Sequence, residues 1–353
     1  MRDAFAIIRT DMNRIEQIGF SDPSHAVTAT VGPVSHGATE ARSAAWQRFN
    51  GTRCLKVCLW GALLLAAYSC FHGQSRLSPS RIIIGNVLNS EPSLTQRYER
   101  LLIANRADNA FLCRTNENVI WRYQDRGGTV SVMGVDFVGE RRGRNLLEVP
   151  PAIDGARVTE IGVGAFLNRK DLVEILLPDS IETIGDFAFA GCTMLNVFQI
   201  PPKVEKIGDC LFVGCSDMTT VRISEKASSV GTFAFLGCES LRNFEVDPNN
   251  RSLMSRDGVL LTRDGSELIC YPSGKKEKRY AIPSAVKVIG KGAFVDCAHL
   301  ARVFVPDCVN EIGDWNFYAC RRLKSVFMNA GACVKLGRNV PSKVFRHGLH
   351  EAE

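Results

Sequence analysis

"IGDFAFAGC", residues 184–192, is followed 23 residues later by "IGDCLFVGC", residues 207–215, and after the same step by "VGTFAFLGC", residues 230–238. Related phrases occupy residues 289–297 and 312–320, again 23 residues apart. Each version keeps a glycine in second place, a phenylalanine in sixth place and a cysteine at its end. A sequence that repeats at one fixed period predicts a stack of similar structural units.

The periodicity extends beyond the quoted phrase to an L-x-x-I-x-I segment in each unit. The recurring phenylalanines are Phe166, Phe189, Phe212, Phe235, Phe294 and Phe317. The apolar segment recurs from Leu172, Leu195, Met218, Leu241, Leu300 and Leu323. A period of about 20–29 residues with this core is the signature of a leucine-rich-repeat solenoid. We therefore predict a mostly β solenoid with short helical or 3-10 arcs, wound as a right-handed superhelix with a parallel concave sheet.

The cysteine that ends each phrase has a structural explanation. Free cysteine is among the most buried residue types, so one per unit predicts an inward row of small thiols. Stacked strands lie about 4.8 Å apart, a distance that does not exclude disulfides between neighbouring units. However, every unit carries the same cysteine, so each could pair with the unit before it or after it and nothing selects one pairing. The spacing does not resemble that of a zinc site. We expect the five thiols to be reduced and buried: Cys192, Cys215, Cys238, Cys297 and Cys320.

One unit is longer than the others. Phe235 and Phe294 are 59 residues apart, which is one period of 23 plus 36. Within the extra stretch, two apolar runs flank Asp264-Gly265 and predict a β-hairpin. The basic run "KKEKR", Lys275–Arg279, follows it. This run is either a solvated loop or a docking point for an acidic protein or glycan.

The pattern L-x-x-I-x-I-P-x-x-V-x-x-I-G-x-x-A-F-x-x-C resembles the BspA-like leucine-rich repeats of bacterial and protist surface proteins, from Thr129 to Phe345. The stretch "VDPNNRSLMSRDGVLLTRDGSELICYPSGKKEKRYAIPSAVKVIGKGAF" is similar to that family's irregular coil. The resemblance implies an extended, curved, non-catalytic module that is usually exported and binds host or matrix proteins. The sequence departs from the pattern in places: Arg169 replaces the cysteine, Leu211 and Asn316 replace alanine, and the last coil shifts register at Leu336-Gly337.

A different kind of segment precedes the repeats. "VCLWGALLLAAYSCF", Val57–Phe71, carries no charge and follows Arg53 and Lys56. A spanning helix needs about 20 apolar residues, so the run fits a signal-peptide core better, with cleavage before Cys70. Cys70 is then a candidate lipidation site; a short membrane anchor and a buried helix are the alternatives. We expect export to the cell surface, the periplasm or the medium, with membrane attachment if this segment is retained or lipidated.

The predicted organisation follows from these segments. Its parts are a disordered or mis-assigned extension (1–54), the signal or anchor segment (55–71), a linker (72–110), cap strands (111–157), the repeat domain (158–345, with a modified coil at 248–285) and a tail (346–353). In the cap, "VIWRYQ" and "TVSVMGVDF" alternate like strands around the turn at Gly127-Gly128.

The strand pattern also predicts the function. Side chains alternate along a strand, so the residues beside each inward position face outward on the concave sheet. Phe304 and Phe327 are adjacent outward aromatics with Arg302 beside them, which is typical of a binding patch. The remaining candidates that extend this surface are Leu176, Gln199 and Arg222. The expected partner is a protein or glycoprotein from host or matrix.

Other classes of function fit less well. A structural spacer of the cell envelope is the alternative, but it has little use for two outward aromatics. No nucleotide-binding, nucleophile-elbow or zinc motif is present in the sequence, so we expect no catalysis, cofactor or metal. The net charge of +6 is diffuse, and no nucleic-acid motif accompanies it.

Overall fold

The computed structural model of the chain describes residues 91, 93–94, 97, 112–116, 119–137, 146–329 and 334–347. The run Val57–Phe71 and Cys70 lie outside the described residues. Among the residues that are described, no helix is long and apolar enough to cross a bilayer. The domain boundaries stay predictions.

An antiparallel cap precedes the repeats. It consists of β1 (Leu112–Asn116), β2 (Val119–Asp125) and β3 (Thr129–Phe137), paired in that order. Gly127 and Gly128 turn the chain between β2 and β3 with positive φ values of 76° and 98°, which glycine adopts without strain. β3 then pairs in parallel with β6 (Ala156–Ile161), which itself forms an antiparallel pair with β5 (Ala152–Ile153). The predicted cap hairpin is confirmed, and it leads directly into the repeats.

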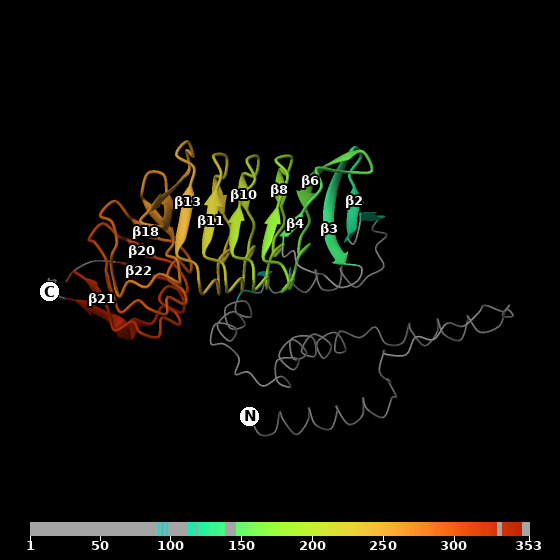
Figure 1. The fold of residues 1–353 in the computed structure, drawn as a ribbon. Coiled ribbons are helices and arrows are strands. Elements are labelled where there is room, and N and C mark those ends of the chain that lie inside the picture. Colours follow the sequence, from blue (N-terminus) through green and yellow to red (C-terminus); the bar gives the residue numbers. More distant parts are fainter. Residues whose placement is uncertain are drawn as a thin grey trace, which may run out of the picture. The chain divides into compact units, whose positions relative to one another are not determined.

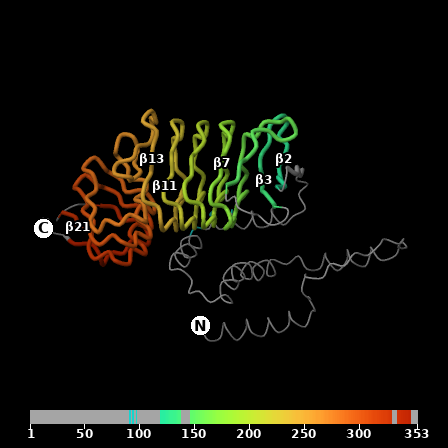
Figure 2. The backbone as a smooth tube through the Cα atoms, in the orientation of Figure 1, coloured from blue at the N-terminus to red at the C-terminus, as the bar shows by residue number. Residues whose placement is uncertain are grey.

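Each repeat then contributes two short strands on different sides of the coil (Figure 1). The L-x-x-I-x-I segments form β4 (Leu146–Glu148), β7 (Glu174–Leu176), β9 (Val197–Gln199), β11 (Thr220–Ile223) and β13 (Asn243–Val246). The segments before each conserved glycine form β8 (Thr183–Ile184), β10 (Lys206–Ile207) and β12 (Ser229–Val230). Partners in parallel pairs such as Thr220 and Asn243 are 23 residues apart, so the sequence period is the stacking register. The tube in Figure 2 follows these coils one after another.

The arc between the two strands of a coil is a series of turns rather than a helix. Positive φ values recur two residues before and two residues after the ladder phenylalanine, as at Phe187 (58°) and Gly191 (74°) around Phe189. Left-handed residues interrupt the right-handed path that a helix needs. The predicted solenoid is therefore confirmed, but most of the expected helical arcs are turns. A 3-10 helix, η2 (Ser342–Val344), lies near the C-terminus.

The modified coil changes the sheet topology. β14 (Leu253–Arg256), β15 (Val259–Thr262) and β16 (Glu267–Cys270) form an antiparallel meander, which confirms the hairpin predicted at Asp264-Gly265. β16 then starts a parallel ladder with β18 (Val288–Ile289), β20 (Glu311–Ile312) and β22 (Lys335–Leu336). On the other side of the coils, β17 (Arg279–Ala281) starts a new sheet with β19 (Arg302–Phe304), β21 (Ser325–Met328) and β23 (Phe345–His347). The strands on this side of the coils therefore form three sheets, β4–β7, β9–β11–β13 and β17–β19–β21–β23. The last two are separated because β13 is followed by the hairpin and Phe244 donates its N–H to Gly258 at 3.1 Å.

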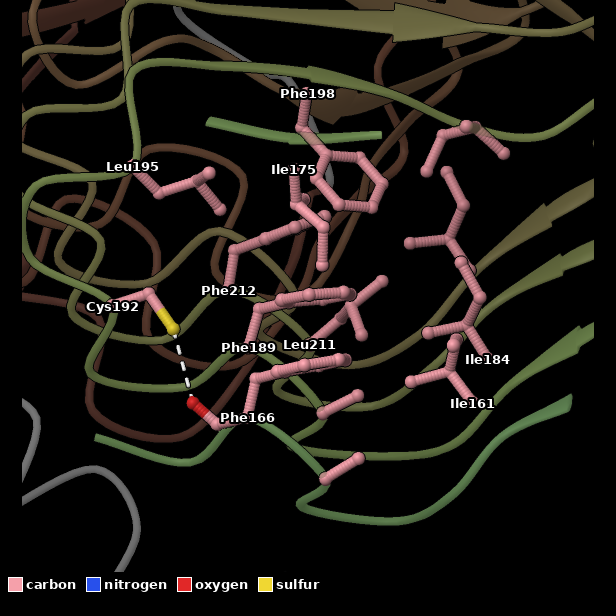
Figure 3. Packing of buried hydrophobic residues seen from close by; sticks show 14 of the residues in the cluster. Ile161, Phe166, Ile175, Ile184, Phe189, Cys192, Leu195, Phe198, Leu211 and Phe212 are labelled. Carbon is pink, nitrogen blue, oxygen red and sulfur yellow. Dashed lines mark hydrogen bonds between the residues drawn. The ribbon is translucent and has the colours of Figure 1, made fainter. Parts of the chain in front are cut away.

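Stacked rings fill the interior of the coils (Figure 3). Phe166 and Phe189 lie 5.1 Å apart between centroids, and Phe189 and Phe212 lie 5.8 Å apart, all nearly parallel. In the modified coil Tyr271 takes the ring position and stacks on Phe294 at 5.2 Å. The interior forms two buried clusters, which divide at the modified coil.

Candidate binding face

The strands that carry the predicted aromatic patch alternate as expected. In β19 and β21 the central residues Val303 and Val326 are completely buried in the second interior cluster. Arg302 is exposed, and Phe304 and Phe327 are half-buried and belong to neither interior cluster. Because successive strand side chains point to opposite faces, both phenylalanines lie on the outer side of this sheet.

The two outer phenylalanines form one apolar surface. Phe304 and Phe327 are directly opposite each other in the parallel pair of β19 and β21. Their ring centroids are 5.1 Å apart and the ring planes differ by 11°. This offset stack holds both rings in one orientation and leaves a flat aromatic area on the sheet.

Arginines from neighbouring strands surround that area. β17 places Arg279 opposite Arg302, and β23 places Arg346 opposite Phe327. Arg279 and Arg302 are exposed, as is Arg346, whose Nη1 donates to the carbonyl of Lys343 at 2.8 Å. Five residues from four strands therefore form what we call the aromatic-basic patch: Arg279, Arg302, Phe304, Phe327 and Arg346.

The basic run Lys275–Arg279, considered separately in the sequence, joins the patch at one end. The Lys278 carbonyl accepts hydrogen bonds from the backbone N–H groups of Ala301 and Arg302, at 2.8 and 2.9 Å. Lys275, at the other end, is used internally: its Nζ donates to the Asp257 carbonyl at 2.7 Å and lies 3.2 Å from Glu277. The run is thus partly a structural loop and partly an extension of the patch, since Arg279 lies one 23-residue period before Arg302.

The other three candidates lie on different strands. Leu176 is on β7 and is 46% exposed, Gln199 is on β9, and Arg222 is opposite Gln199 on β11. Arg222 is already engaged, with its Nε 2.9 Å from Glu245 Oε2. The divided sheet separates this group from the aromatic-basic patch, so the structure does not bring all six residues together.

The ladder thiols are buried and unpaired. Cys192, Cys215, Cys238, Cys297 and Cys320 are free cysteines, each at most 8% exposed. Burial raises the pKa of Cys192 to about 12 and that of Cys215 well above its ordinary value. A thiol that stays protonated is a poor nucleophile and a poor metal ligand. Within the described ranges, no group of three or more His, Cys, Asp or Glu side chains could hold a metal ion.

A pocket of about 220 Å³ is lined by residues of the modified coil and of the coils on either side of it. Phe233, Tyr271, Glu267 and Lys291 are among the residues that line it. Burial, with a smaller effect of Asp264, raises the pKa of Glu267. The repeat pattern did not predict a site on the arc side of the coils, although large apolar residues stand two positions before the ladder phenylalanines: Phe187, Phe233 and Trp315.

Comparison with known proteins agrees with this architecture. The family described as "BspA type Leucine rich repeat region" matches residues 156–256 and 271–343, in six copies. No curated protein matches the chain.

Solved structures of similar proteins come from several bacteria. A leucine-rich repeat protein from Eubacterium ventriosum has 17% identity and a TM-score of 0.47, over 65% of this chain and 68% of its own. The pneumococcal vaccine antigen PcpA has 17% identity and a TM-score of 0.41, over 67% of this chain and 85% of its own. The T. pallidum leucine-rich repeat protein has 25% identity and a TM-score of 0.36, over 64% and 83%.

Proposed function

The repeat region of this chain belongs to the BspA-type leucine-rich repeat family, and on that premise we propose that the protein is an exported, non-catalytic binding protein. Its binding surface is the aromatic-basic patch on β17, β19, β21 and β23. The observation that carries this proposal is the stacked pair Phe304–Phe327, which lies on the outer side of the sheet beside three arginines.

The composition of the patch defines the kind of partner. Burying apolar area contributes about 25 cal/mol per Å², so two adjacent rings are a favourable anchor. Aromatic and arginine side chains are the residues that most often dominate interface energies. Arginines bind carboxylates with paired, charge-assisted hydrogen bonds. The partner that fits is a protein with an acidic segment beside an apolar one.

Export is supported by the sequence of the N-terminal region. The uncharged run Val57–Phe71 follows basic residues, as the core of a signal peptide does. We expect residues 1–69 to be absent from, or disordered in, the mature protein, with Cys70 as its first residue if the protein is lipidated. Mass spectrometry of the mature N-terminus distinguishes lipidation, simple cleavage and a retained anchor. A cytosolic protein that begins at Met1 contradicts export in all three forms.

The binding surface can be tested with a pair of matched variants. The double substitution Phe304→Ser/Phe327→Ser removes the aromatic anchor, and Leu176→Ser removes an exposed apolar residue from the other sheet. Both proteins, checked by circular dichroism and thermal unfolding, are used with the wild type in pulldowns from surface and matrix extracts. We expect the double variant to lose the partners that Leu176→Ser retains. A folded double variant that keeps every partner rules out the patch as the binding surface.

The charge of the partner can be tested separately. Reversing Arg279 and Arg302 to glutamate leaves the rings in place but makes this edge of the patch acidic. For a partner with an acidic segment, we expect at least a tenfold loss of affinity at low salt and a smaller loss at high salt, because ions screen exposed charges. An unchanged affinity contradicts an acidic partner and leaves the aromatic anchor to be judged by the preceding experiment.

A further inference from the structure

A third apolar cluster lies outside the two interior clusters, on the side of the coils formed by the arcs. It contains residues two positions before the ladder phenylalanines, which we call the arc-face row: Phe187, Cys210, Phe233 and Trp315. Although these residues are not part of the ring ladder, none is more than 6% exposed. Because these large aromatic side chains lie outside the interior ladder, another segment must cover them.

The described residues of the N-terminal segment supply that cover. Leu94 is 4% exposed and is a member of the same cluster as the arc-face row. Ser93, Leu94 and Arg97 have helical backbone conformation. The Leu94 N–H donates to the Glu91 carbonyl at 3.0 Å, and the side chains of Glu91, Leu94 and Arg97 all contact the arc side. We call the segment that carries these three residues the clasp.

The basic end of the clasp is bound by a preorganised pair of acids. Arg97 makes ion pairs with Asp186 and with Asp209, the latter at 2.6 Å. These aspartates occupy the same place in adjacent coils. Each already accepts a backbone hydrogen bond from the next coil: Asp209 N–H to Asp186 Oδ1 at 2.7 Å, and Thr232 N–H to Asp209 Oδ1 at 2.8 Å. These bonds already hold both carboxylates in place. Arg97 can therefore bridge the two coils with charge-assisted hydrogen bonds while the aspartates lose little further conformational entropy.

The acidic end of the clasp meets bases. Glu91 Oε1 lies 2.8 Å from Lys291 Nζ and 3.8 Å from Arg338 Nη2. Arg338 is itself held 2.8 Å from Asp314 Oδ2. Reversing the direction of the clasp would place Glu91 against two aspartates and Arg97 against two bases. The charges on the arc side therefore select one orientation of the clasp.

We propose that the arc-face row is a second binding surface, specific for a segment with an acid, a leucine three residues later and an arginine six residues later, and that the chain's own clasp occupies it in cis. The clasp covers the aromatic side chains and the Cys210 thiol, and it couples coils on both sides of the modified coil. Without it, Phe187, Phe233 and Trp315 form a contiguous apolar patch of the kind that mediates protein association.

Cys210 provides a local reporter of the clasp in the full chain. It belongs to the clasp cluster and is fully buried, whereas Cys215 of the same coil lies in the interior ladder and is also fully buried. Labelling with a maleimide, followed by mass spectrometry of each cysteine, compares the two thiols in one protein. For the double variant Leu94→Ser/Arg97→Glu we expect Cys210 to label at least tenfold faster than in the wild type, with Cys215 still protected. Slow labelling of Cys210 in a folded double variant overturns the proposal.

A milder charge exchange keeps the test informative if the double variant unfolds and exposes both thiols. Glu91→Lys should accelerate the labelling of Cys210, and adding Lys291→Glu should slow it again by restoring an ion pair of opposite sign. Lys203→Glu is the matched control, because Lys203 is an exposed base 3.8 Å from Glu182 on another part of the coils. No acceleration by Glu91→Lys, or no recovery with Lys291→Glu, contradicts the role of this ion pair in the clasp.

The same measurement distinguishes a clasp in cis from one supplied by a second copy. A clasp in cis protects Cys210 equally at protein concentrations that differ by a factor of 100. Protection that is lost on dilution, together with a dimer by sedimentation, shows exchange of the clasp between chains and overturns the cis assignment. The aromatic-basic patch takes no part in these labelling rates, so this test is independent of the proposed function.

Discussion

At the scale of single residues, one hydrogen bond explains four of the five repeated cysteines; the Cys297 thiol instead lies 3.7 Å from the Val295 carbonyl. The thiols of Cys192, Cys215, Cys238 and Cys320 donate to the carbonyl of the ladder phenylalanine in the preceding coil, at 3.0–3.2 Å. Figure 3 shows this bond between Cys192 and Phe166. The carbonyls of Phe166, Phe189 and Phe212 also accept a backbone N–H from their own coil, as Phe189 does from Cys192 at 3.2 Å. The thiol is small enough for the interior and supplies a second donor to a buried oxygen.

This role predicts a difference between two substitutions of Cys215. Cys215→Ala removes the donor and leaves a small cavity, which should lower the free energy of unfolding by about 1–2 kcal/mol. Cys215→Ser keeps a donor near the Phe189 carbonyl and should cost less. Urea unfolding of the two variants measures both. A larger loss for serine than for alanine would mean that the thiol acts only as apolar filling.

Tyr271 is a second residue whose environment has a clear consequence. It is 2% exposed, and its hydroxyl has no hydrogen-bond partner among the described residues. Burial is also the main reason why the pKa of Tyr271 is raised. A buried hydroxyl without a partner costs about 1–3 kcal/mol.

Tyr271→Phe should therefore stabilise the protein by about 1–2 kcal/mol, because it removes the unpaired hydroxyl and keeps the ring stacked on Phe294. The reverse change in the next coil, Phe294→Tyr, is the control and should destabilise. Thermal and urea unfolding give both values. A Tyr271→Phe protein that is less stable than the wild type would show that the hydroxyl has a stabilising partner.

At the scale of elements, the hairpin of the modified coil depends on its turn. Asp264 Oδ1 accepts hydrogen bonds from the Thr262 hydroxyl at 2.7 Å and from the backbone N–H and hydroxyl of Ser266 at 3.0 and 2.8 Å. The Thr262 hydrogen bond is the largest cause of a pKa for Asp264 lowered from 3.8 to about 2, followed by those of Ser266. These bonds favour the charged form of the carboxylate.

The sign of the pH dependence follows from this lowered pKa. The contribution of the turn is present above pH 3.8 and is lost as the pH falls toward 2, where the folded state must take up the proton. Thr262→Val should raise the pKa of Asp264 toward its ordinary value, which a carbon-detected NMR titration of the carboxyl group measures. An unchanged pKa would mean that Ser266 alone determines it.

Another element-level feature is the substitution of alanine by Asn316 in the last ring-bearing coil. Its Nδ2 donates to the carbonyls of Gly290 and Gly313, at 2.8 and 2.9 Å, and its Oδ1 accepts the N–H of Phe294 at 3.0 Å. In a regular coil the corresponding N–H, that of Phe166, donates to the backbone carbonyl of Ala188. The amide thus replaces a backbone acceptor in an arc with a different path.

Arg169, in the cysteine position of the first coil, has a different role. It donates to the Val135 carbonyl at 3.1 Å and joins that coil to the cap.

At the scale of the whole molecule, stability is distributed along the stack. Each coil contacts mainly its neighbours, so the loss of one ladder ring should weaken the interfaces on both sides. Phe317 stacks on Phe294 at 5.2 Å and meets Phe345 edge-on at 6.0 Å. Its ring therefore connects the last complete coil to the strand that closes the sheet, whereas Phe304 contributes to the outer surface.

Phe317→Ser should lower the free energy of unfolding by about 3–5 kcal/mol, through the cavity and the buried hydroxyl. Phe304→Ser should cost about 1 kcal/mol, the value of a surface ring stack. Chemical denaturation compares the two, with circular dichroism as the check on native structure. Equal losses would show that the inward and outward positions are assigned incorrectly.

The sequence alone determined the solenoid, the positions of its coils and the cap hairpin. The 23-residue step specifies which side chains stack, because parallel strands pair at the same interval, as Thr220 and Asn243 do. Alternation then separates Val303 and Val326 from Phe304 and Phe327. These features depend on local patterns that repeat, so a single sequence is enough to predict them.

Only the tertiary structure decided where the sheet divides, that Arg346 lies beside the aromatic pair and what covers the arc-face row. Arg279 keeps the 23-residue step to Arg302, whereas Arg346 lies only 19 residues after Phe327 and reaches the patch because the chain re-enters the parallel sheet at β23. The contacts from Arg97 to Asp186 and Asp209 join residues about a hundred positions apart. Such contacts follow no period in the sequence. They depend on how a non-repeating segment packs against the completed stack, since the surface it binds exists only once the coils are folded.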